Sequence, residues 1–510
     1  MSRLDKAALL LSLITILTSY LVADRIFDRI PHLEDEMAYV WQSETIPNGE
    51  ILVPSPPCTG CFLVPFVIDH NGFRFGKYPL GWPVVLSIAY VLNGRDWVNP
   101  IIAGLCIWFL YRIIQKITKN DWTAILGAFL TASSPFFLLN SGSLLSHPWS
   151  LLLTLVFTCA WLDLYLNNTT LPRPLLTLTA AFTLGALILT RPFTAAAIAI
   201  PFFIHGAILF LKRKSTFRWE LFGIGIFAVF CVGLYLLWQY HVTGSPLTNP
   251  YTLWWSYDTI GFGPGHGRQE GGYMPDDIWM ATKPGLESLL DDTYGWENLS
   301  WVFLPFGLIA LWKNRQAWLV SSILPMLILA YLLYWINAQL FGPRYYYEGI
   351  ESFSLLSAAG ITWLVGEIPK TGFKFIETER WLRPLIVLIG LSALVGWNLI
   401  SYLPERLQGM YGLYGANETR LSIFTNPATA PETPAVVIVH IHESWIEYGA
   451  LLDLSTPYLD TPYVITLNMG EDNNQIVNDA FPDRYIYEYD PSGDFYHFIL
   501  VREPISNTAQ

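Results

Sequence analysis

The chain has few charged residues for its length. Only 14% of its 510 residues are charged and 53% are hydrophobic, whereas soluble domains carry about 25% charged residues. This deficit excludes an ordinary soluble protein, because much of the surface must be solvated by something other than water. Basic residues are scarcer than acidic ones, 29 against 41, and the net charge of −12 argues against a nucleic-acid-binding surface.

Cysteines are also few. Five of them exclude a disulfide-rich scaffold, and Cys106, Cys159 and Cys231 lie in apolar runs, where we expect them to be packing residues. Cys58 and Cys61 form a single CxxC pair, which cannot supply the four thiolates of an all-cysteine zinc site. We expect a local disulfide there, and a redox role is the alternative.

The sequence has no phosphate-binding loop. The glycine-rich residues 261–268 have no strand before them and no Lys-Ser/Thr after them, so they do not form a P-loop. This argues against an ATP-driven pump, and the lack of an internal repeat weakens an inverted-repeat transporter. We expect this segment to be a flexible lid over a site, with His266 or Arg268 touching substrate.

Long apolar runs, in contrast, are abundant. About eleven of them approach the roughly 20 residues that a helix needs to cross a bilayer, which predicts a polytopic α-helical membrane protein. The run at residues 79–92 is too short to cross and fits a helix lying in the interface. Arg3 and Lys6 precede the first run without a small-residue cleavage site after it, which indicates an uncleaved first helix. The eleven runs are residues 7–24, 98–117, 121–140, 147–166, 174–190, 193–211, 219–240, 299–313, 316–336, 350–366 and 384–403.

Basic residues in the short loops predict the orientation. A cytoplasmic N-terminus places the compact basic clusters inside, whereas the opposite orientation would place them all outside. The outer segments are then residues 25–97, 241–298 and 404–510. The inner basic residues are Lys116, Lys119, Arg173, Lys212, Arg213, Lys214, Arg218, Lys313, Arg315, Lys370, Lys374, Arg380 and Arg383.

The composition changes after residue 403. Four segments are rich in β-branched and aromatic residues, as strands are, and are separated by turn residues. We therefore expect a transmembrane domain at residues 1–403 and a small soluble α/β domain at 404–510, outside the membrane. The four segments are residues 435–440, 463–467, 485–489 and 495–501.

Three adjacent carboxylates follow the first apolar run. Glu34, Asp35 and Glu36 repel one another, so at least one should bind a cation, find a donor or hold a proton. Such a group suits a general base or a metal ligand beside a lipid-borne substrate, and His32 is a neighbouring candidate for substrate contact. The alternative is a solvated acidic loop.

Two cations are candidate phosphate ligands. Lys77 lies at the other end of the first outer segment, where it suits a lipid phosphate as a point charge; snorkelling or a headgroup contact is the alternative. Arg344 follows a late apolar run, and its planar fork suits a phosphate. Its alternative role is an interface anchor within an aromatic belt formed by Tyr345, Tyr346 and Tyr347.

Two further residues are weaker candidates for substrate contact. Arg191 lies between two apolar runs near the outer face, with an acidic group of the first outer segment or the substrate as its expected partner. A turn-capping role explains Arg191 equally well. His147 also faces outward, although a lone histidine is more often a packing residue than a ligand.

These motifs resemble the GT-C superfamily of membrane glycosyltransferases, in particular the bacterial protein mannosyltransferase and aminoarabinose transferase group. The resemblance is carried by Pro31-His32-Leu33-Glu34-Asp35-Glu36, by Lys77-Tyr78-Pro79-Leu80-Gly81 and by a helix ending in Tyr111-Arg112. The order of helices and loops agrees with the family over roughly residues 1–400, whereas the sequence motifs match only over short stretches. The family has a Lys-Pro-Pro-Leu-like motif, so Tyr78 replaces the first proline here.

The resemblance implies a function for each motif. The acidic pair supplies the catalytic carboxylate, assigned to Asp35 with Glu36 beside it, and Lys77 with Tyr78 faces the carrier phosphate. The late arginine of the family, with its aromatic partner, implies that Arg344 lies near the donor phosphate, with Tyr345 beside it as a weaker candidate for substrate contact. The expected reaction is inverting transfer of a sugar from a polyprenyl-phosphate donor to a hydroxyl of a lipid, glycan or protein acceptor, outside the membrane.

Three questions stay open at this stage. No cofactor is certain, although Asp35 and Glu36 permit a divalent cation. A transporter or flippase of lipid-linked saccharides is the alternative function, but it should carry ionisable residues within its spans, near the midplane, and the apolar runs carry almost none. A non-catalytic membrane scaffold is the third possibility, and it gives Asp35 and Lys77 no special role.

Overall fold

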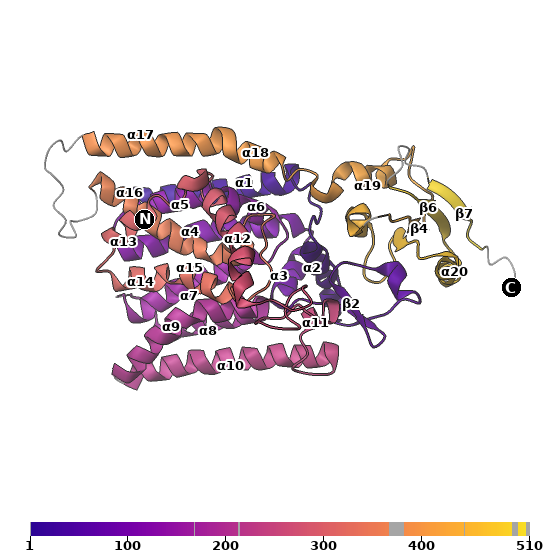
Figure 1. The fold of residues 1–510 in the computed structure, drawn as a ribbon, viewed down its shortest axis with the longest axis horizontal. Helices are drawn as coiled ribbons and strands as arrows, with labels where there is room; N and C mark the ends of the chain where they lie inside the picture. The colour runs from indigo at the N-terminus through magenta and orange to yellow at the C-terminus, as the bar shows by residue number, and fades with distance from the viewer. Residues whose placement is uncertain are drawn as a thin grey trace.

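The structure is a computed structural model that describes residues 2–167, 169–212, 215–366, 382–442, 444–491 and 498–505. A bundle of helices carries a region of short helices and strands at one end, and a four-stranded sheet lies beyond that region (Figure 1). Helix α1 (Arg3–Arg25) begins at the end of the bundle that is farthest from this sheet. Several basic residues of the expected inner loops lie outside the described residues, namely Arg213, Lys214, Lys370, Lys374 and Arg380.

Seven helices in the described part of the chain are long and apolar enough to cross a membrane, which makes this an integral membrane protein. A bent pair, α5 (Asp121–Ala132) and α6 (Pro135–Gly142), would be an eighth span with a 59° break. The break lies where Pro135 begins α6, since proline cannot continue the hydrogen bonding of a preceding helix. The seven are α1, α4 (Val98–Thr118), α7 (His147–Tyr165), α8 (Arg173–Thr190), α9 (Pro192–Lys212), α10 (Ser215–Thr243) and the helical stretch Leu382–Gln408, which begins with α17 (Leu382–Trp397) and continues through a π-helical turn into α18 (Leu403–Gln408).

The expected count of eleven spans is not confirmed. The runs at residues 299–313 and 316–336 contain only short helices, and α16 (Ile350–Val365) has 16 residues. A helix of that length is about 24 Å long, which is shorter than a hydrocarbon core of about 30 Å. The short helices are α13 (Leu304–Ala310), α14 (Arg315–Ser321) and α15 (Ile323–Tyr331).

A β-hairpin organises the first outer segment. Strands β2 (Val67–His70) and β3 (Phe73–Gly76) are antiparallel, and β1 (Val53–Pro54) pairs with the other edge of β3. The hairpin turns at Asn71 and Gly72, which have φ angles of 55° and 81°, as a two-residue type I′ turn requires. Lys77 comes directly after β3. The run at 79–92 contains α3 (Gly81–Val91), which is too short to cross, as expected.

The C-terminal sheet confirms the expected strands. Its order is β5-β4-β6-β7, with β4 parallel to both β5 and β6 and with β7 antiparallel to β6. Residues 495–497 of the last expected strand lie outside the described residues. The strands are β4 (Ala435–Val439), β5 (Tyr463–Leu467), β6 (Tyr485–Tyr489) and β7 (Phe498–Arg502), and α19 (Glu418–Thr425) and α20 (Glu471–Ala480) accompany them.

Both faces of this sheet are covered, as is usual where strands are parallel. Val437 and Val439 pack on one face against Phe424. The other face receives Cys58 and Cys61 of the first outer segment, and these two cysteines form the expected disulfide. The C-terminal residues therefore share a core with residues 58–62, and an independent domain at 404–510 stays a prediction.

Candidate functional site

The first acidic cluster opens helix α2 (Glu34–Thr45), and its carboxylates point in different directions. Glu36 turns back and accepts hydrogen bonds from the backbone N–H groups of His32 (2.9 Å) and Leu33 (3.0 Å) and from that of Leu144 (2.6 Å). It thus satisfies amides that a helix start leaves without partners. Burial raises the pKa of Glu36 to about 7, and the three backbone donors act in the opposite direction.

Asp35 and Glu36 therefore do not converge on a common ligand. Within the described residues no three His, Cys, Asp or Glu side chains are grouped as a metal site requires. Both carboxylate oxygens of Glu36 are occupied by backbone donors, so the geometry gives Glu36 a structural role and leaves Asp35 as the candidate catalytic group. The expected cation site of Asp35 with Glu36 is not supported.

Asp35 is partly buried among cations. It accepts hydrogen bonds from the hydroxyl of Tyr78 and from Nη2 of Arg344, the latter at 2.8 Å. Burial raises the pKa of Asp35, but the charges of Arg344 and Lys77 outweigh this effect and hold the pKa below its usual value. The carboxylate is therefore ionised, and it is held between two residues that the sequence had placed near a phosphate.

Lys77 lies in an aromatic cage and is only 3% exposed. Its Nζ is 3.2 Å from the ring centroid of Phe66, 4.9 Å from that of Tyr251 and 5.1 Å from that of Trp255. Asp258 is 4.0 Å from the same nitrogen. Burial lowers the pKa of Lys77 to about 8, although Asp35 and Asp258 act in the opposite direction.

A close contact of α2 with the hairpin brings Lys77 and Asp35 together. Nε2 of Gln42 donates to the backbone oxygen of Tyr78 at 2.9 Å. The backbone at Gly76 also lies close to this side chain, since a Cβ there would be 2.4 Å from Gln42. The hairpin and α2 are thus locked in one register, and two residues far apart in the sequence act on each other.

Arg344 has a buried nitrogen that no group satisfies. It opens the short helix η6 (Arg344–Gly349), and while Nη2 contacts Asp35, its Nη1 is buried and has no hydrogen-bond partner among the described residues. An unsatisfied buried donor is costly, and a guanidinium nitrogen in this position fits an incoming anion. Beside it, Tyr345 stacks on Tyr331 with 4.7 Å between ring centroids.

The prediction that residues 345–347 form an aromatic belt at the membrane interface is wrong for Tyr346 and Tyr347. Tyr346 and Tyr347 are 1% and 0% exposed, so they do not face lipid. The hydroxyl of Tyr347 donates to the backbone oxygen of Phe137 at 3.2 Å. These tyrosines anchor the segment that carries Arg344 to the bundle.

Arg191 has a different partner from the one expected. It faces Glu348 at 3.7 Å and hydrogen-bonds Tyr331 and His147, not an acidic residue of the first outer segment. Its charge still acts on Asp35. His147 is buried at the start of α7, which agrees with packing and hydrogen bonding.

The second outer segment covers the cluster with residues 250–255 and with Arg268, whereas the expected lid comprised residues 261–268 and stays a prediction. Helix α11 (Pro250–Trp254) and Trp255 lie against Lys77, and Arg268 stacks on Trp255 at 5.5 Å. The charge of Arg268 acts on Glu34, whose pKa is raised to about 7 by burial and by Asp35.

The two remaining histidines do not join this cluster. His266 binds Thr259 at 2.6 Å within its own loop. His32 is fully buried and contacts the Ile30 carbonyl at 2.8 Å.

Sequence reasoning missed Asp258 and Glu348. Asp258 counters Lys77 and also accepts hydrogen bonds from Tyr334 and Trp335. Its only signal was its position directly after the aromatic-rich stretch Trp254-Trp255-Ser256-Tyr257. Glu348 follows three tyrosines and pairs with Arg191. The available signal in the sequence was a carboxylate close to Arg344, a candidate phosphate ligand.

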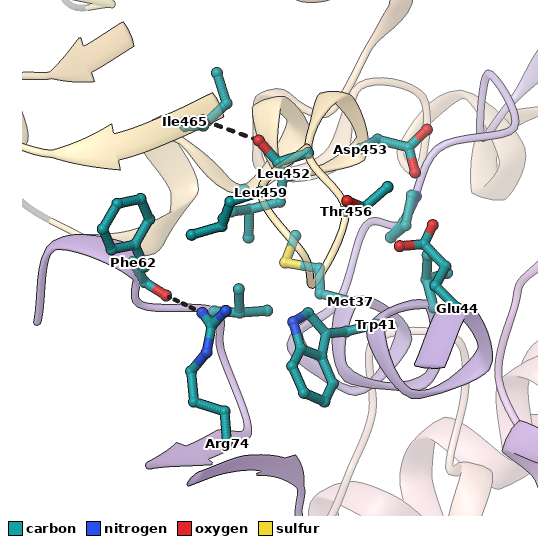
Figure 2. Close-up of a pocket in the computed structure, with 15 residues that line it drawn as sticks. Met37, Trp41, Glu44, Phe62, Arg74, Leu452, Asp453, Thr456, Leu459 and Ile465 are labelled. Carbon is teal, nitrogen blue, oxygen red and sulfur yellow. Dashed lines mark hydrogen bonds between the residues drawn. The ribbon is translucent and has the colours of Figure 1, made fainter. Parts of the chain in front are cut away.

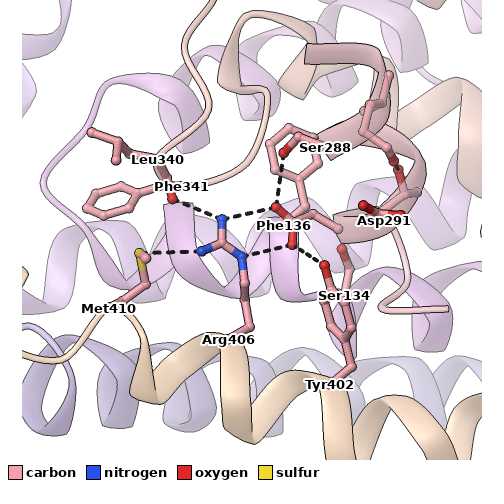
Figure 3. Close-up of polar contacts among 12 residues, drawn as sticks. Ser134, Phe136, Ser288, Asp291, Leu340, Phe341, Tyr402, Arg406 and Met410 are labelled. Atoms are coloured by element: carbon pink, nitrogen blue, oxygen red, sulfur yellow. Dashed lines mark hydrogen bonds and ion pairs between the residues drawn. The ribbon is translucent and has the colours of Figure 1, made fainter. Parts of the chain in front are cut away.

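A second ionic cluster supports the segment before Arg344 (Figure 3). Asp292, at the end of α12 (Ile278–Asp292), accepts hydrogen bonds from Nε of Arg406 at 2.9 Å and from the Tyr402 hydroxyl at 2.8 Å. Arg406, on α18 (Leu403–Gln408), also donates to the Leu340 backbone oxygen at 3.0 Å. Leu340 precedes Arg344 by four residues, so the cluster fixes the start of the segment that carries Arg344.

We expect the substitution Asp292→Asn to lower the free energy of unfolding by about 1–3 kcal/mol, because it leaves the mostly buried Arg406 without its counter-ion. The measurement is thermal unfolding of the purified protein in detergent. Glu287→Gln on the same helix is the matched control, since Glu287 is 60% exposed and should change stability by less than about 0.5 kcal/mol. Equal midpoints for the two variants would contradict the assigned role of Asp292.

Comparisons with known proteins bear on the fold. No family model matches the sequence, and no curated protein matches it. Among solved structures, the chain resembles ArnT from Cupriavidus metallidurans bound to undecaprenyl phosphate, with a TM-score of 0.55 and 12% identity. It also resembles ArnT in the apo state, with a TM-score of 0.52 and 12% identity. Both comparisons cover 94% of this chain and 92% of the other, so the likeness extends over the whole fold.

Proposed function

We propose that this chain, which has a GT-C-like fold, transfers a sugar from a polyprenyl-phosphate carrier to an acceptor hydroxyl. The observation that carries the proposal is one buried cluster in which Asp35 contacts Arg344, Lys77 acts on both, and Nη1 of Arg344 has no partner. A carboxylate beside two cations supplies a base and a phosphate site in one place. The similar structure of ArnT bound to undecaprenyl phosphate supports a lipid phosphate as the ligand.

In this proposal the cations hold the phosphate. Nη1 of Arg344 takes one phosphate oxygen, and Lys77 leaves its aromatic cage to take another. Both charges stabilise the phosphate as it gains negative charge in the transition state, in a site from which the second outer segment excludes water. Tyr78 continues to orient Asp35 through the hydrogen bond of its hydroxyl.

Donor binding then activates the base. In the free protein the charge of Arg344 lowers the pKa of Asp35. A bound phosphate shares that charge and adds a negative one nearby, and both changes raise the pKa of a carboxylate. Asp35 therefore becomes a stronger base only after the donor has bound, which suits an ordered reaction.

The chemistry needs one base and one leaving group. The acceptor oxygen forms a bond to the anomeric carbon, the bond from that carbon to the phosphate oxygen breaks with its electron pair on the phosphate, and Asp35 takes the acceptor proton. No second carboxylate acts as a covalent nucleophile, so the anomeric configuration should invert.

The basic inner loops place the N-terminus in the cytoplasm in this proposal. Helix α1 begins at the end of the bundle away from the C-terminal sheet (Figure 1). The cluster and the sheet then lie on the extracytoplasmic side, where lipid-linked sugars meet acceptors that are lipids, glycans or proteins.

The pKa of Lys77 predicts a pH dependence. This pKa is lowered to about 8, so the ammonium is charged below that pH and loses its charge as the pH rises through it. We expect the affinity for undecaprenyl phosphate to fall about tenfold between roughly pH 7 and pH 9.5. Equilibrium binding to the purified protein measures this, and the variant Lys77→Met should bind weakly at every pH. A wild-type affinity that does not change over this range would exclude Lys77 as the titrating phosphate ligand.

Mass spectrometry of cell-envelope lipids and glycans with and without the protein tests the proposed function. The proposal predicts that one sugar modification disappears and that its polyprenyl-phosphate donor accumulates. Intact sugars with a changed distribution between membrane leaflets would contradict it and favour the flippase.

A further inference from the structure

An open cleft lies between helix α2 and the C-terminal region (Figure 2). It is bounded by α2, by strand β3 with residues 62–64, and by residues 449–465 of the C-terminal region. Met37, Trp41 and Glu44 line it from α2. The cleft therefore combines residues of the first and last outer segments.

Helix geometry separates the cleft from the donor site. Met37, Trp41 and Glu44 follow each other at intervals of four and three residues and so share one face of α2. Asp35 precedes Met37 by two residues, a rotation of about 200° around the helix axis. A ligand in the cleft thus binds behind the helix that presents the catalytic carboxylate, and does not displace the donor.

A buried cation lines one end of the cleft. Arg74 is 4% exposed, and its guanidinium donates to the backbone oxygens of Phe62 (3.3 Å) and Pro457 (3.0 Å), whereas its Nε has no partner. The guanidinium also lies 5.7 Å from the ring of Trp41. No carboxylate of the described residues thus contacts Arg74, and the N–H group at its Nε remains available to donate a hydrogen bond.

Carboxylates line the other end. The Glu44 side chain makes no hydrogen bond or ion pair with any described residue, and burial, with the charge of Asp453, raises the pKa of Glu44 to about 8. Asp453 is itself held by Arg95 at 2.7 Å and 3.0 Å. Glu44 therefore offers a free hydrogen-bonding group at the opposite end from Arg74.

This arrangement selects among ligand chemistries. An anionic ligand would suit Arg74 but would find no free cation at the other end, where Arg95 is already paired with Asp453. A cationic ligand would be repelled by Arg74 and would face a Glu44 side chain that is mostly protonated near neutral pH. A neutral polyol satisfies both ends, because each hydroxyl can accept from a guanidinium and donate to a carboxylate. The flat C–H face of a sugar ring also fits beside the indole of Trp41, whose face is electron-rich.

The cleft does not offer the usual site for a peptide strand. Strand β5 is the edge strand of the C-terminal sheet, and a peptide could extend that sheet by pairing with its free amides. However, the amide of Ile465, which lines the cleft, already donates to the Ser455 hydroxyl at 2.9 Å. A saccharide needs no strand edge, so the observations favour it over a peptide.

We propose that this cleft between α2 and the C-terminal region binds a neutral saccharide portion of the acceptor, using Trp41, Glu44 and Arg74. The inference rests on the proposed transferase function and assigns its acceptor class as a sugar-bearing molecule. Pro31, just before α2, also lines the cleft, so an acceptor held there passes around the start of α2 to reach Asp35. Binding energy from this remote contact then serves to position the reacting hydroxyl.

The binding test uses the purified full-length protein without donor and three neutral probes, N,N′-diacetylchitobiose, maltotriose and mannobiose. Saturation-transfer NMR should detect at least one of them, and Glu44→Ala should weaken its affinity about tenfold. Glu44→Gln keeps a hydrogen-bond acceptor and should retain most of the affinity. Glu287→Ala, at an exposed glutamate on α12, should bind as the wild type does.

Three outcomes of this experiment overturn the inference. The first is that none of the three saccharides binds, and the second is that Glu44→Ala binds as tightly as the wild type. The third is that a blocked serine/threonine pentapeptide displaces the bound saccharide, which would indicate a peptide site. The unfolding midpoint of Glu44→Ala should equal that of the wild type, because Glu44 has no partner to lose.

A transfer assay with extracted envelope lipids as acceptor separates this inference from the proposed function. Glu44→Ala should raise the KM for acceptor about tenfold and leave the KM for donor unchanged. Unchanged acceptor kinetics would overturn the acceptor assignment while sugar transfer itself stands. An absence of transfer by the wild type, with saccharide binding intact, would instead contradict the proposed transferase.

Discussion

The variant Asp35→Asn is expected to lose sugar transfer by a factor of about 10²–10⁴, the range in which a general base contributes. Asparagine keeps the shape of the side chain and an oxygen for the Tyr78 hydroxyl, but it cannot take the acceptor proton. Single-turnover transfer with purified protein and a polyprenyl-phosphate sugar measures the effect. Binding of undecaprenyl phosphate should persist, because Arg344 is then free of its carboxylate partner.

Glu34→Gln is the matched control for Asp35→Asn. Glu34 neighbours Asp35 at the start of α2 and shares its surroundings, but it makes no contact with Arg344. We expect its rate to remain within a few-fold of the wild type. Full activity in Asp35→Asn, or a larger loss in Glu34→Gln, would assign the base to another residue.

The variant Lys77→Met is expected to reduce kcat/KM for the donor by about 10²–10³, because a charge that stabilises the leaving phosphate is removed from a buried site. Methionine fits the cage of Phe66, Tyr251 and Trp255 that surrounds Lys77. The fold should therefore tolerate the change. Steady-state kinetics over a range of donor concentrations measures the loss.

Lys283→Met controls for the general effect of removing a lysine. Lys283 lies on α12 in the second outer segment and is 51% exposed, with only an i,i+4 pair to Glu287. Its donor kinetics should match those of the wild type. A Lys77→Met enzyme with unchanged donor kinetics and an intact fold would remove Lys77 from the phosphate site.

The main residues of the candidate site could be found from local sequence, because the chemistry restricts which residue types can serve. Asp35, Lys77 and Arg344 stood out as charges beside apolar runs, and the structure places them in one cluster. The strand β4 was equally visible as a continuous β-branched run. The Asn71-Gly72 turn, which sets the hairpin before Lys77, carried a clear signal that the sequence reading did not use.

The parts that were missed depend on tertiary contacts. Glu36 looked like a second catalytic carboxylate, but one of its three donors is the amide of Leu144, far away in the sequence. Asp258 acquires its role only when the second outer segment folds over Lys77. Glu348 likewise becomes the partner of Arg191 only in the assembled bundle.

The expected number of spans is not confirmed, because a count of apolar residues does not test the continuity of a helix. The run at residues 316–336 satisfies the length criterion but breaks between α14 and α15 at Ser322. The run at 299–313 forms only the seven-residue helix α13. These short helices pack beside α16, so their apolar residues are buried by protein as well as by any lipid.

A cryo-EM map of the full-length protein with undecaprenyl phosphate tests most directly whether Asp35, Lys77 and Arg344 share one lipid headgroup. The account predicts phosphate density within hydrogen-bonding distance of Nη1 of Arg344 and Nζ of Lys77, with Lys77 moved out of its aromatic cage. Phosphate bound elsewhere, for example at Arg74 behind α2, or a Lys77 that stays in its cage in the complex, would contradict it.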